Sequence, residues 1–311
     1  KGWLPLEDDV TALEPVAPPT QKAIFAYGYN ASGGGRLSMS NLVNSSGVVA
    51  ADVTGVGTAR MTIAATSYGG DKAIFGYGDS GSATNLSNLV SSSGVIASDT
   101  TGVGTARYAP AAASYDGDKG IFGYGDTGGD SYVSLTNLVN NSGVIASDTT
   151  GVGTARRYLA ATGYGSSGQA VFAYGSTGSR LSMRNLVSNS GVVASDATGV
   201  GSARNNLAAV KYGTDKAIFG YGSTGSITGV TNLVSNVGVI ASDVSGVGTA
   251  RQYLAAASYG GDKALFGYGN TASGAVSMTN LVNNSGVVGS DVTGVGSVRE
   301  TLGAAGYSTS A

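Results

Sequence analysis

The sequence predicts an all-β protein built as a six-bladed β-propeller. Three observations carry this prediction: a repeat of 47 to 49 residues, four strand-like segments in each repeat, and chain ends that supply complementary parts of one repeat. Repeats of roughly 20–50 residues are typical of solenoids, propellers and other arrays. Four short strands in each repeat favour a propeller blade among these architectures.

The repeat is defined by the tripeptide Asn-Leu-Val. An Arg follows each of these Asn residues by 19 positions, and a Tyr follows each Arg by a further eight. All six Phe residues of the chain occupy one register, within IFxYG or a close variant, and we expect them to pack between neighbouring blades. The six copies of the tripeptide start at Asn41, Asn88, Asn137, Asn185, Asn232 and Asn280.

The second repeat illustrates the four expected strands. Thr62–Tyr68 (TIAATSY) is a strand of small residues, and a Gly-Gly-Asp turn leads to the apolar strand Lys72–Tyr77 (KAIFGY). A polar loop precedes the third strand, Leu86–Val90, and a short turn leads to the fourth, Val95–Thr100. Gly, Ser, Asn and Asp cluster at the boundaries, as hairpin turns require. No segment keeps the helical period of about 3.6 residues, so no helix is expected.

The two ends of the repeat region predict a closed ring. The first repeat begins with its second strand at Lys22, and the chain ends after Leu302–Tyr307, which matches a first strand. Pairing these two strands would remove a free sheet edge, which an open solenoid would leave exposed. The sequence therefore predicts six four-stranded blades in residues 21–311, with one blade completed by strands from both ends of the chain.

Residues 1–20 are expected to form a separate, extended N-terminal arm. This stretch holds four of the five Pro residues and the only Trp, Trp3. Pro-rich segments favour extended linkers. Two interpretations remain open, a solvated tether or an anchoring arm in which Trp3, Leu4 and Leu6 dock into a partner protein. The sequence starts with Lys1 rather than Met, which leaves open whether further residues precede it.

Composition excludes several classes of function. There is no His and no Cys, which excludes Ser-His and Cys-His nucleophile pairs, disulfides, and zinc sites built on these residues. Net charge is −2, with 17 basic and 19 acidic residues, so we expect no electrostatic binding of nucleic acid. No apolar stretch approaches the roughly 18 residues of a membrane-spanning helix, so no membrane insertion is expected.

The repeated polar residues are expected to be structural. GVGTAR recurs with no helix after it, so its Gly-Val-Gly is better interpreted as a turn than as a phosphate loop. The repeat Arg residues and the Asp residues eight positions before them are expected to form ion pairs or backbone hydrogen bonds at blade junctions, rather than a ring of ligands. Asp116 and Asp118 are expected to form a turn, because calcium loops need more oxygen ligands. We therefore expect no metal site and no cofactor.

A recognition site is expected among the residues that depart from the repeat. Loop length varies mainly after the IFxYG strand, and sequence varies just after each repeat Arg. In a four-stranded blade these two zones lie on the same face of the ring, and Tyr combined with Asn, Gln and Arg suits a hydrated interface or a sugar. The alternative is that these loops vary because nothing constrains them. The candidates are Tyr29, Asn30, Arg36, Tyr108, Asp126, Asp130, Tyr132, Arg157, Tyr158, Asn205, Asn206, Gln252 and Tyr253.

The repeat resembles two related families. The pattern R-x₇-YGGDKAIFGYG resembles the kelch signature, although Gly-Tyr-Gly or Ala-Tyr-Gly replaces the double Gly and the kelch Trp is missing. More closely, the pattern TNLVSxSGVxASDTTGVGTAR followed by YGGDKAIFGYG resembles kelch-like repeat proteins of marine tailed phages, including cyanophages, over residues 21–311. The resemblance implies a virion or tail-associated protein, and no catalytic residues carry over from it.

The expected function is that of a non-enzymatic component of a phage virion, a tail or head appendage or fibre located outside the cell. It would dock to other virion proteins through its arm and recognise a host glycan or surface protein. Two alternatives remain. A carbohydrate-active propeller enzyme would need paired carboxylates in a cleft, and a bacterial surface adhesin would share the binding role without the phage.

Overall fold

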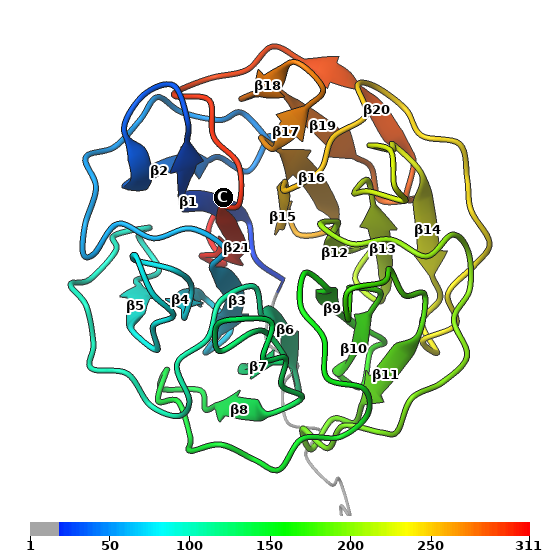
Figure 1. The fold of residues 1–311 in the computed structure, drawn as a ribbon. Helices are drawn as coiled ribbons and strands as arrows, with labels where there is room; N and C mark the ends of the chain where they lie inside the picture. The colour runs from blue at the N-terminus through cyan, green and yellow to red at the C-terminus, as the bar shows by residue number, and fades with distance from the viewer. Residues whose placement is uncertain (1–18) are drawn as a thin grey trace, which may run out of the picture.

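The computed structural model describes residues 19–311, and every regular element in that range is a β-strand. Six antiparallel sheets of three or four strands lie around a common centre, with the first strand of each repeat innermost (Figure 1), and a seventh sheet is a two-stranded hairpin. This confirms the predicted all-β class, in a propeller-like arrangement of small sheets. The arm residues Trp3, Leu4 and Leu6 lie outside the described residues.

Five of the sheets around the centre each take their strands from one repeat, with strands two and three outside strand one. Four sheets comprise β3 (Ala64–Tyr68), β4 (Lys72–Gly76) and β5 (Ser87–Val90); β6 (Ala111–Tyr115), β7 (Lys119–Gly123) and β8 (Thr136–Val139); β9 (Ala160–Tyr164), β10 (Gln169–Ala173) and β11 (Arg184–Val187); and β12 (Ala208–Tyr212), β13 (Lys216–Gly220) and β14 (Thr231–Val234). A further sheet comprises β15 (Ala255–Tyr259), β16 (Lys263–Gly267), β19 (Thr279–Val282) and β20 (Val288–Val292), and a small hairpin, β17 (Asn270–Thr271) with β18 (Gly274–Ala275), follows β16.

The remaining sheet joins residues from both ends of the described chain. β1 (Lys22–Asn30) lies between β2 (Gly35–Val43) and β21 (Gly303–Tyr307). β21 pairs antiparallel with β1 from Lys22↔Tyr307 to Ala26↔Gly303. The C-terminal strand therefore supplies the first strand that the N-terminal repeat lacks, as the sequence predicts.

Burial explains why each repeat forms these strands. Most of the innermost strands alternate between buried and half-buried residues, as in β3, whose half-buried Ala65 packs against the core between neighbouring sheets. The second strands are buried at four consecutive positions, as in β4, because they lie between two strands and between two sheets. A run of apolar residues without alternation fits such a strand, and KAIFG is such a run.

Backbone hydrogen bonds join neighbouring sheets at one end of the inner strands. The residue two positions after each repeat Arg donates its N–H to the carbonyl of the equivalent residue in the preceding sheet. The six bonds, of 2.8–3.2 Å, run from Thr62 to Thr301, from Ala109 to Thr62, from Tyr158 to Ala109, from Asn206 to Tyr158, from Tyr253 to Asn206 and from Thr301 to Tyr253. The series returns to its first residue, and we call it the axial circuit.

A second set of bonds joins the sheets at the opposite end, through the turns between first and second strands. Each turn donates one N–H to the corresponding turn of the next sheet at 2.6–3.0 Å. The bonds run from Gly69 to Asp118, from Asp116 to Gly168, from Gly165 to Asp215, from Gly213 to Asp262, from Gly260 to Gln21 and from Ser308 to Asp71. Each sheet is therefore tied to both neighbours at both ends of its inner strands.

The core lies between neighbouring sheets. At each interface the Phe of one sheet packs against the Tyr of the preceding IFxYG segment, with ring centroids 5.1–5.3 Å apart. Such aromatic pairs contribute about 0.5–1.5 kcal/mol each beyond the burial of their area. The prediction that the Phe residues pack between neighbouring repeats is confirmed. The pairs are Phe25–Tyr268, Phe75–Tyr27, Phe122–Tyr77, Phe172–Tyr124, Phe219–Tyr174 and Phe266–Tyr221.

The outermost strand is less regular than the sequence predicts. Within residues 19–311 only the sheet of β15 has a full fourth strand, β20. In the second repeat the outer segment contacts β5 through two isolated bridges, Ser87↔Thr100 and Val90↔Ile96. Between these bridges Asn88 Nδ2 donates to Ala97 O at 3.0 Å and to Asp99 Oδ1 at 2.9 Å. These side-chain bonds replace part of the backbone ladder, which shifts the register by one residue.

Candidate functional site

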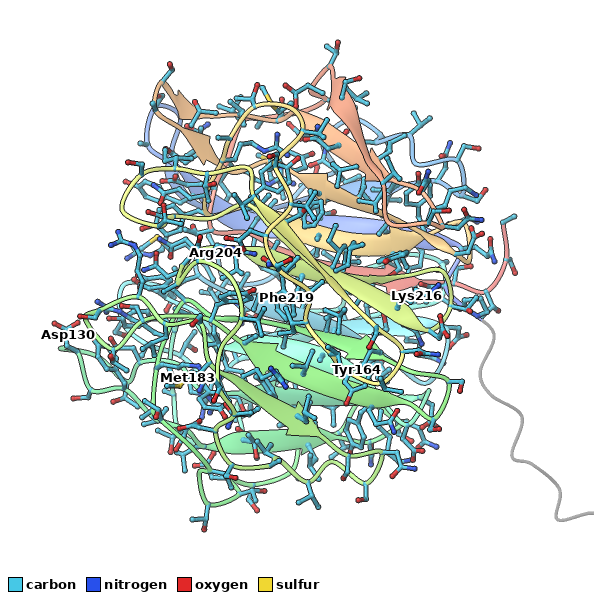
Figure 2. The ribbon with its side chains drawn as sticks, turned by 90° about the vertical axis from the view of Figure 1, so that its right-hand side faces the viewer. Asp130, Tyr164, Met183, Arg204, Lys216 and Phe219 are labelled. Carbon is cyan, nitrogen blue, oxygen red and sulfur yellow. The ribbon has the colours of Figure 1, made fainter. Side chains whose placement is uncertain are left out.

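The two variable zones lie together at one end of the inner strands. Isolated bridges join the residue after each repeat Arg to the loop that follows the IFxYG segment of the same sheet, as in Tyr108↔Asp126. We call this the loop end, and the opposite end, with turns such as Gly69–Asp71, the hairpin end. Figure 2 shows Asp130 at the loop end and Lys216 at the hairpin end.

The repeat Arg residues are buried at the junctions between sheets. Arg156 is 0% exposed, and its Nη2 donates to Asn185 Oδ1 of β11 at 2.8 Å. Its guanidinium lies 4.3 Å from the ring centroid of Tyr124 in the preceding sheet. Burial lowers the pKa of the Arg156 guanidinium from its ordinary value. The same environment recurs at every junction, which fits the structural role expected for these residues.

The repeat Asp residues accept hydrogen bonds at the same junctions. Asp196 accepts from the N–H and hydroxyl of Thr154 at 2.9 and 2.6 Å, and from Asn185 Nδ2 at 2.9 Å. Burial alone would raise the pKa of the Asp196 carboxyl, but these hydrogen bonds lower it below its ordinary value. Arg156 Nη1 lies 3.9 Å from Asp196 Oδ1, so the Asp–Arg contact joins different repeats rather than residues eight positions apart.

The short acidic pair at the hairpin end is bound by a lysine. Lys119 Nζ lies 2.6 Å from Asp116 Oδ2 and 3.3 Å from Asp118 Oδ1, within an exposed turn. In residues 19–311 no group of three or more acidic, His or Cys side chains is arranged to hold a metal ion. The same part of the chain contains no helix that is long and apolar enough to cross a bilayer.

Five of the candidate recognition residues form one polar cluster at the loop end. Arg157 Nη1 binds Asp126 Oδ2 at 2.7 Å, and its Nη2 binds Asp130 Oδ1 at 2.8 Å. The Tyr108 hydroxyl donates to Asp126 at 3.0 Å, and the Tyr132 hydroxyl donates to Asp130 at 3.1 Å. Asp126 is fully buried. One guanidinium thus binds two carboxylates, which leaves the cluster with a net charge of −1, and these bonds hold the loop in place.

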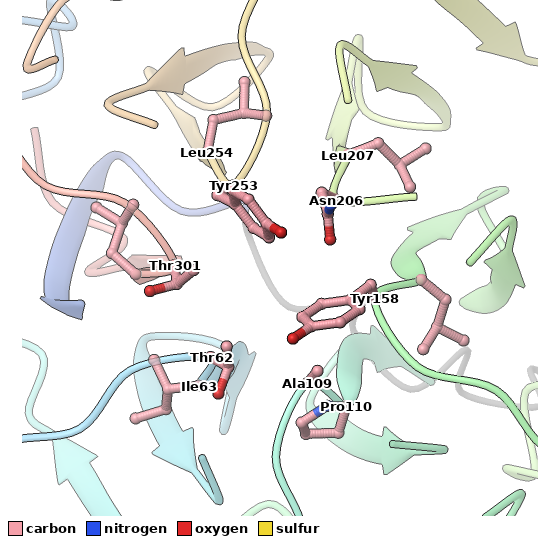
Figure 3. A pocket seen from close by; sticks show the side chains of 12 residues that line it. Thr62, Ile63, Ala109, Pro110, Tyr158, Asn206, Leu207, Tyr253, Leu254 and Thr301 are labelled. Atoms are coloured by element: carbon pink, nitrogen blue, oxygen red, sulfur yellow. The ribbon is translucent and has the colours of Figure 1, made fainter. Parts of the chain in front are cut away.

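Three other candidates meet at the centre of the loop end, in a shallow pocket of about 80 Å³. Figure 3 shows Tyr158, Asn206 and Tyr253 pointing toward the middle of this pocket. The Tyr158 and Tyr253 rings are 6.0 Å apart between centroids and meet edge to face, at 75°. Burial raises the pKa of Tyr158 to about 12 and also raises that of Tyr253, so both phenols keep their protons at neutral pH.

The remaining candidates lie outside these two groups. Arg36 Nη2 binds Asp79 of the neighbouring sheet at 3.0 Å. Asn30 Oδ1 accepts from the N–H of Ser32 in its own loop at 3.0 Å. Three more candidates each form one isolated β-bridge: Tyr29 with Glu300, Gln252 with Asn270, and Asn205 with Ser223. The structure thus divides the thirteen candidates between a polar cluster, an axial pocket and scattered positions.

Nine of the twelve residues that line the pocket are not among the candidates predicted from the sequence, and three of the nine are equivalent in the repeat to Tyr158, Asn206 and Tyr253. Thr62, Ala109 and Thr301 line it beside Tyr158, Asn206 and Tyr253. All six occupy the second position after a repeat Arg. The register of the repeat would have found them, because equivalent residues of a ring of repeats lie at the same height along its axis.

No protein-family model matches the chain. No curated protein matches it either.

Proposed function

We propose that the chain is a closed, six-bladed, kelch-like β-propeller that serves as a non-enzymatic binding module. The two circuits of backbone hydrogen bonds and the pairing of β1 with β21 support the closed ring. One observation supports the binding role. The repeated side chains make structural contacts at the sheet junctions, whereas the residues that differ between repeats lie at the loop end.

The proposed setting is the virion of a tailed phage. In this proposal the chain is an extracellular tail or head appendage or fibre, which docks to other virion proteins through residues 1–20, with Trp3, Leu4 and Leu6 as anchors. The loop end then faces outward to recognise a host glycan or surface protein. The resemblance of the repeat to kelch-like proteins of marine phages supports this setting. Detection of the chain in purified virions would distinguish it from a bacterial surface adhesin.

A binding role is favoured over a carbohydrate-active enzyme. Glycosidases need two carboxyl groups roughly 5–9.5 Å apart on either side of the scissile bond. The two acids of the polar cluster, Asp126 and Asp130, both bind Arg157, and no acid is among the residues of the described chain that line the axial pocket. Release of reducing sugar from host envelope by the purified chain would contradict this assignment.

The test blocks one end of the molecule at a time. Because the chain has no Cys, a single introduced Cys can carry a bulky polyethylene glycol at a defined place. Ser226→Cys lies in an exposed loop at the loop end, and Ser166→Cys lies in an exposed turn at the hairpin end. We expect the label at residue 226 to abolish binding to host cells and the label at residue 166 to leave it unchanged. The reverse result would assign recognition to the hairpin end.

A further inference from the structure

The axial pocket differs from the sheet junctions because its six equivalent positions hold different types of residue. Its six equivalent positions are occupied by Thr62, Ala109, Tyr158, Asn206, Tyr253 and Thr301. The residue after each of them is apolar, either Ile, Pro or Leu. These apolar residues also line the pocket, while the two Tyr residues and the Asn between them supply one side of it with aromatic and polar groups (Figure 3).

One polar atom in this pocket has no partner. Asn206 is only 9% exposed, and its Oδ1 accepts no hydrogen bond. Its Nδ2 is directed to Asn205 Oδ1, at 3.4 Å. A buried acceptor without a donor is uncommon in folded proteins and calls for an explanation. A ligand that brings a hydroxyl or N–H group into the pocket would satisfy this atom.

The backbone fixes the direction in which these side chains leave the main chain. Tyr158, Asn206 and Tyr253 have φ values of 55°, 56° and 57°, in the left-handed region that residues with a side chain rarely adopt. The axial circuit holds each of them there through its N–H and its carbonyl. Strained backbone that is held by its surroundings is characteristic of preorganised sites. The pocket should therefore bind without a change of shape.

The chemistry of the lining favours an uncharged ligand. No residue that lines the pocket, in the part of the chain that the structure describes, is charged. The Arg157 guanidinium lies over the Tyr158 ring, 5.1 Å from its centroid, and is bound by Asp126 and Asp130. The tyrosine hydroxyls stay protonated because burial raises their pKa. The pocket thus offers aromatic surface, hydroxyl donors and one amide acceptor, and no group that would neutralise an ion.

We propose that the axial pocket binds the terminal ring of a neutral saccharide, with Asn206 Oδ1 accepting from a sugar hydroxyl. This inference rests on the proposed function and names the ligand of the loop end. The near-perpendicular rings of Tyr158 and Tyr253 form a corner in which the apolar face of a pyranose packs on one ring and its edge on the other. A shallow pocket of about 80 Å³ takes part of one ring, so the remaining sugars of a glycan extend over the loops.

The test compares two neighbouring asparagines, Asn206→Ala and Asn205→Ala. Ala is compatible with the backbone at position 206, because Ala109 occupies the equivalent place with φ of 51°. Binding is measured by saturation-transfer NMR and titration with methyl glucoside, methyl galactoside and methyl mannoside, beside the acidic glucuronate and galacturonate. We expect a neutral sugar to bind the wild type and to bind Asn206→Ala about tenfold more weakly, as for the loss of one hydrogen bond. Asn205→Ala removes the long contact of 3.4 Å to Asn206 Nδ2 but leaves Asn206 Oδ1 in place, so it should weaken binding much less than Asn206→Ala.

Several results would overturn this inference. These are the absence of binding by every neutral probe, preference for the acidic probes, or equal weakening by both variants when their melting temperatures match that of the wild type. Host-cell binding separates this inference from the proposed function. If the wild type and Asn206→Ala bind cells equally, the pocket is not the site although the loop end can still be. If the wild type binds no cells, the proposed function is wrong, and the sugar titration alone decides the role of the pocket.

Discussion

At the scale of single residues, the chain places six arginines in positions that water does not reach. Each guanidinium binds the Asn of the Asn-Leu-Val tripeptide in the sheet whose inner strand follows that Arg, and it lies over a Tyr ring of the preceding sheet. Removing a charge from water costs several kcal/mol unless partners compensate. These contacts explain why a sequence with few charged residues keeps one Arg in every repeat.

This arrangement predicts a large difference between two arginines of the same molecule. Arg156→Leu removes the donor to Asn185 and the nearby cation of Asp196, and should lower the free energy of unfolding by about 3 kcal/mol. Arg180→Leu is the control, because its hydrogen bond to Ser223 Oγ is long, at 3.4 Å. That change should stay within about 0.5 kcal/mol. Urea unfolding measures both, and similar losses would contradict the assigned role of the buried arginine.

At the scale of elements, the junction between neighbouring sheets depends on an Asp in the outer segment as much as on strand pairing. Asp148 accepts from the N–H and hydroxyl of Thr105 at 3.0 and 2.6 Å, and from Asn137 Nδ2 at 2.9 Å. Thr105 follows the preceding repeat, so one carboxylate ties two sheets together. The equivalent Asp291 makes the same bonds from within β20, so the junction bonds are compatible with a full fourth strand.

The junction carboxylates predict a loss of stability in acid. Burial raises the pKa of Asp148, but the hydrogen bonds from Thr105 and Asn137 outweigh it, and the net pKa is lowered. A lowered folded-state pKa gives stability that is complete above the unfolded value of about 3.9 and is lost as pH falls through the folded value. The urea concentration at the midpoint of unfolding should therefore decrease as the pH is lowered below about 4. Asp148→Asn should be less stable at pH 7 and should show a weaker acid dependence, whereas an identical pH profile would refute this role.

At the scale of the whole molecule, the two ends of the described chain depend on each other. β21 pairs with β1 over five residues. Just before β21, Thr301 takes part in the axial circuit, and just after it, Ser308 takes part in the set of bonds at the hairpin end. Each other sheet receives its inner strand from the segment just before its second strand. Only this sheet needs residues that lie about 280 positions apart along the chain.

Deletion of Thr301–Ala311 should therefore open the molecule. The loss of β21 exposes one edge of β1 and breaks both circuits, so we expect unfolding or aggregation. Deletion of residues 309–311 is the matched control, because it leaves β21 and the bond from Ser308 to Asp71 in place. Light scattering and thermal melting measure the result. A monomeric 301–311 deletion with an unchanged melting temperature would contradict closure by this strand.

The sequence by itself determined the strand order, the packing of Phe25 and its equivalents between sheets, and the pairing of the last strand with the first repeat. These features depend on local alternation and on a repeat that imposes the same contacts at every copy. It also indicated which end of the strands carries the variable residues. It overestimated the fourth strand, which among the described residues is complete only in the sheet of β15. The side-chain bonds of Asn88 recur at Asn280 beside the full strand β20, so they do not explain the difference.

Only the tertiary structure decided which variable residues meet. Asn205 and Asn206 are identical in type and adjacent in sequence, yet only Asn206 lines the axial pocket. Tyr158 and Tyr253 are separated by two repeats, and their rings meet because the sheets surround one centre. The physical reason is that these positions are set by the axial circuit. Its hydrogen bonds join residues of different repeats and hold a left-handed backbone that no short stretch of sequence specifies.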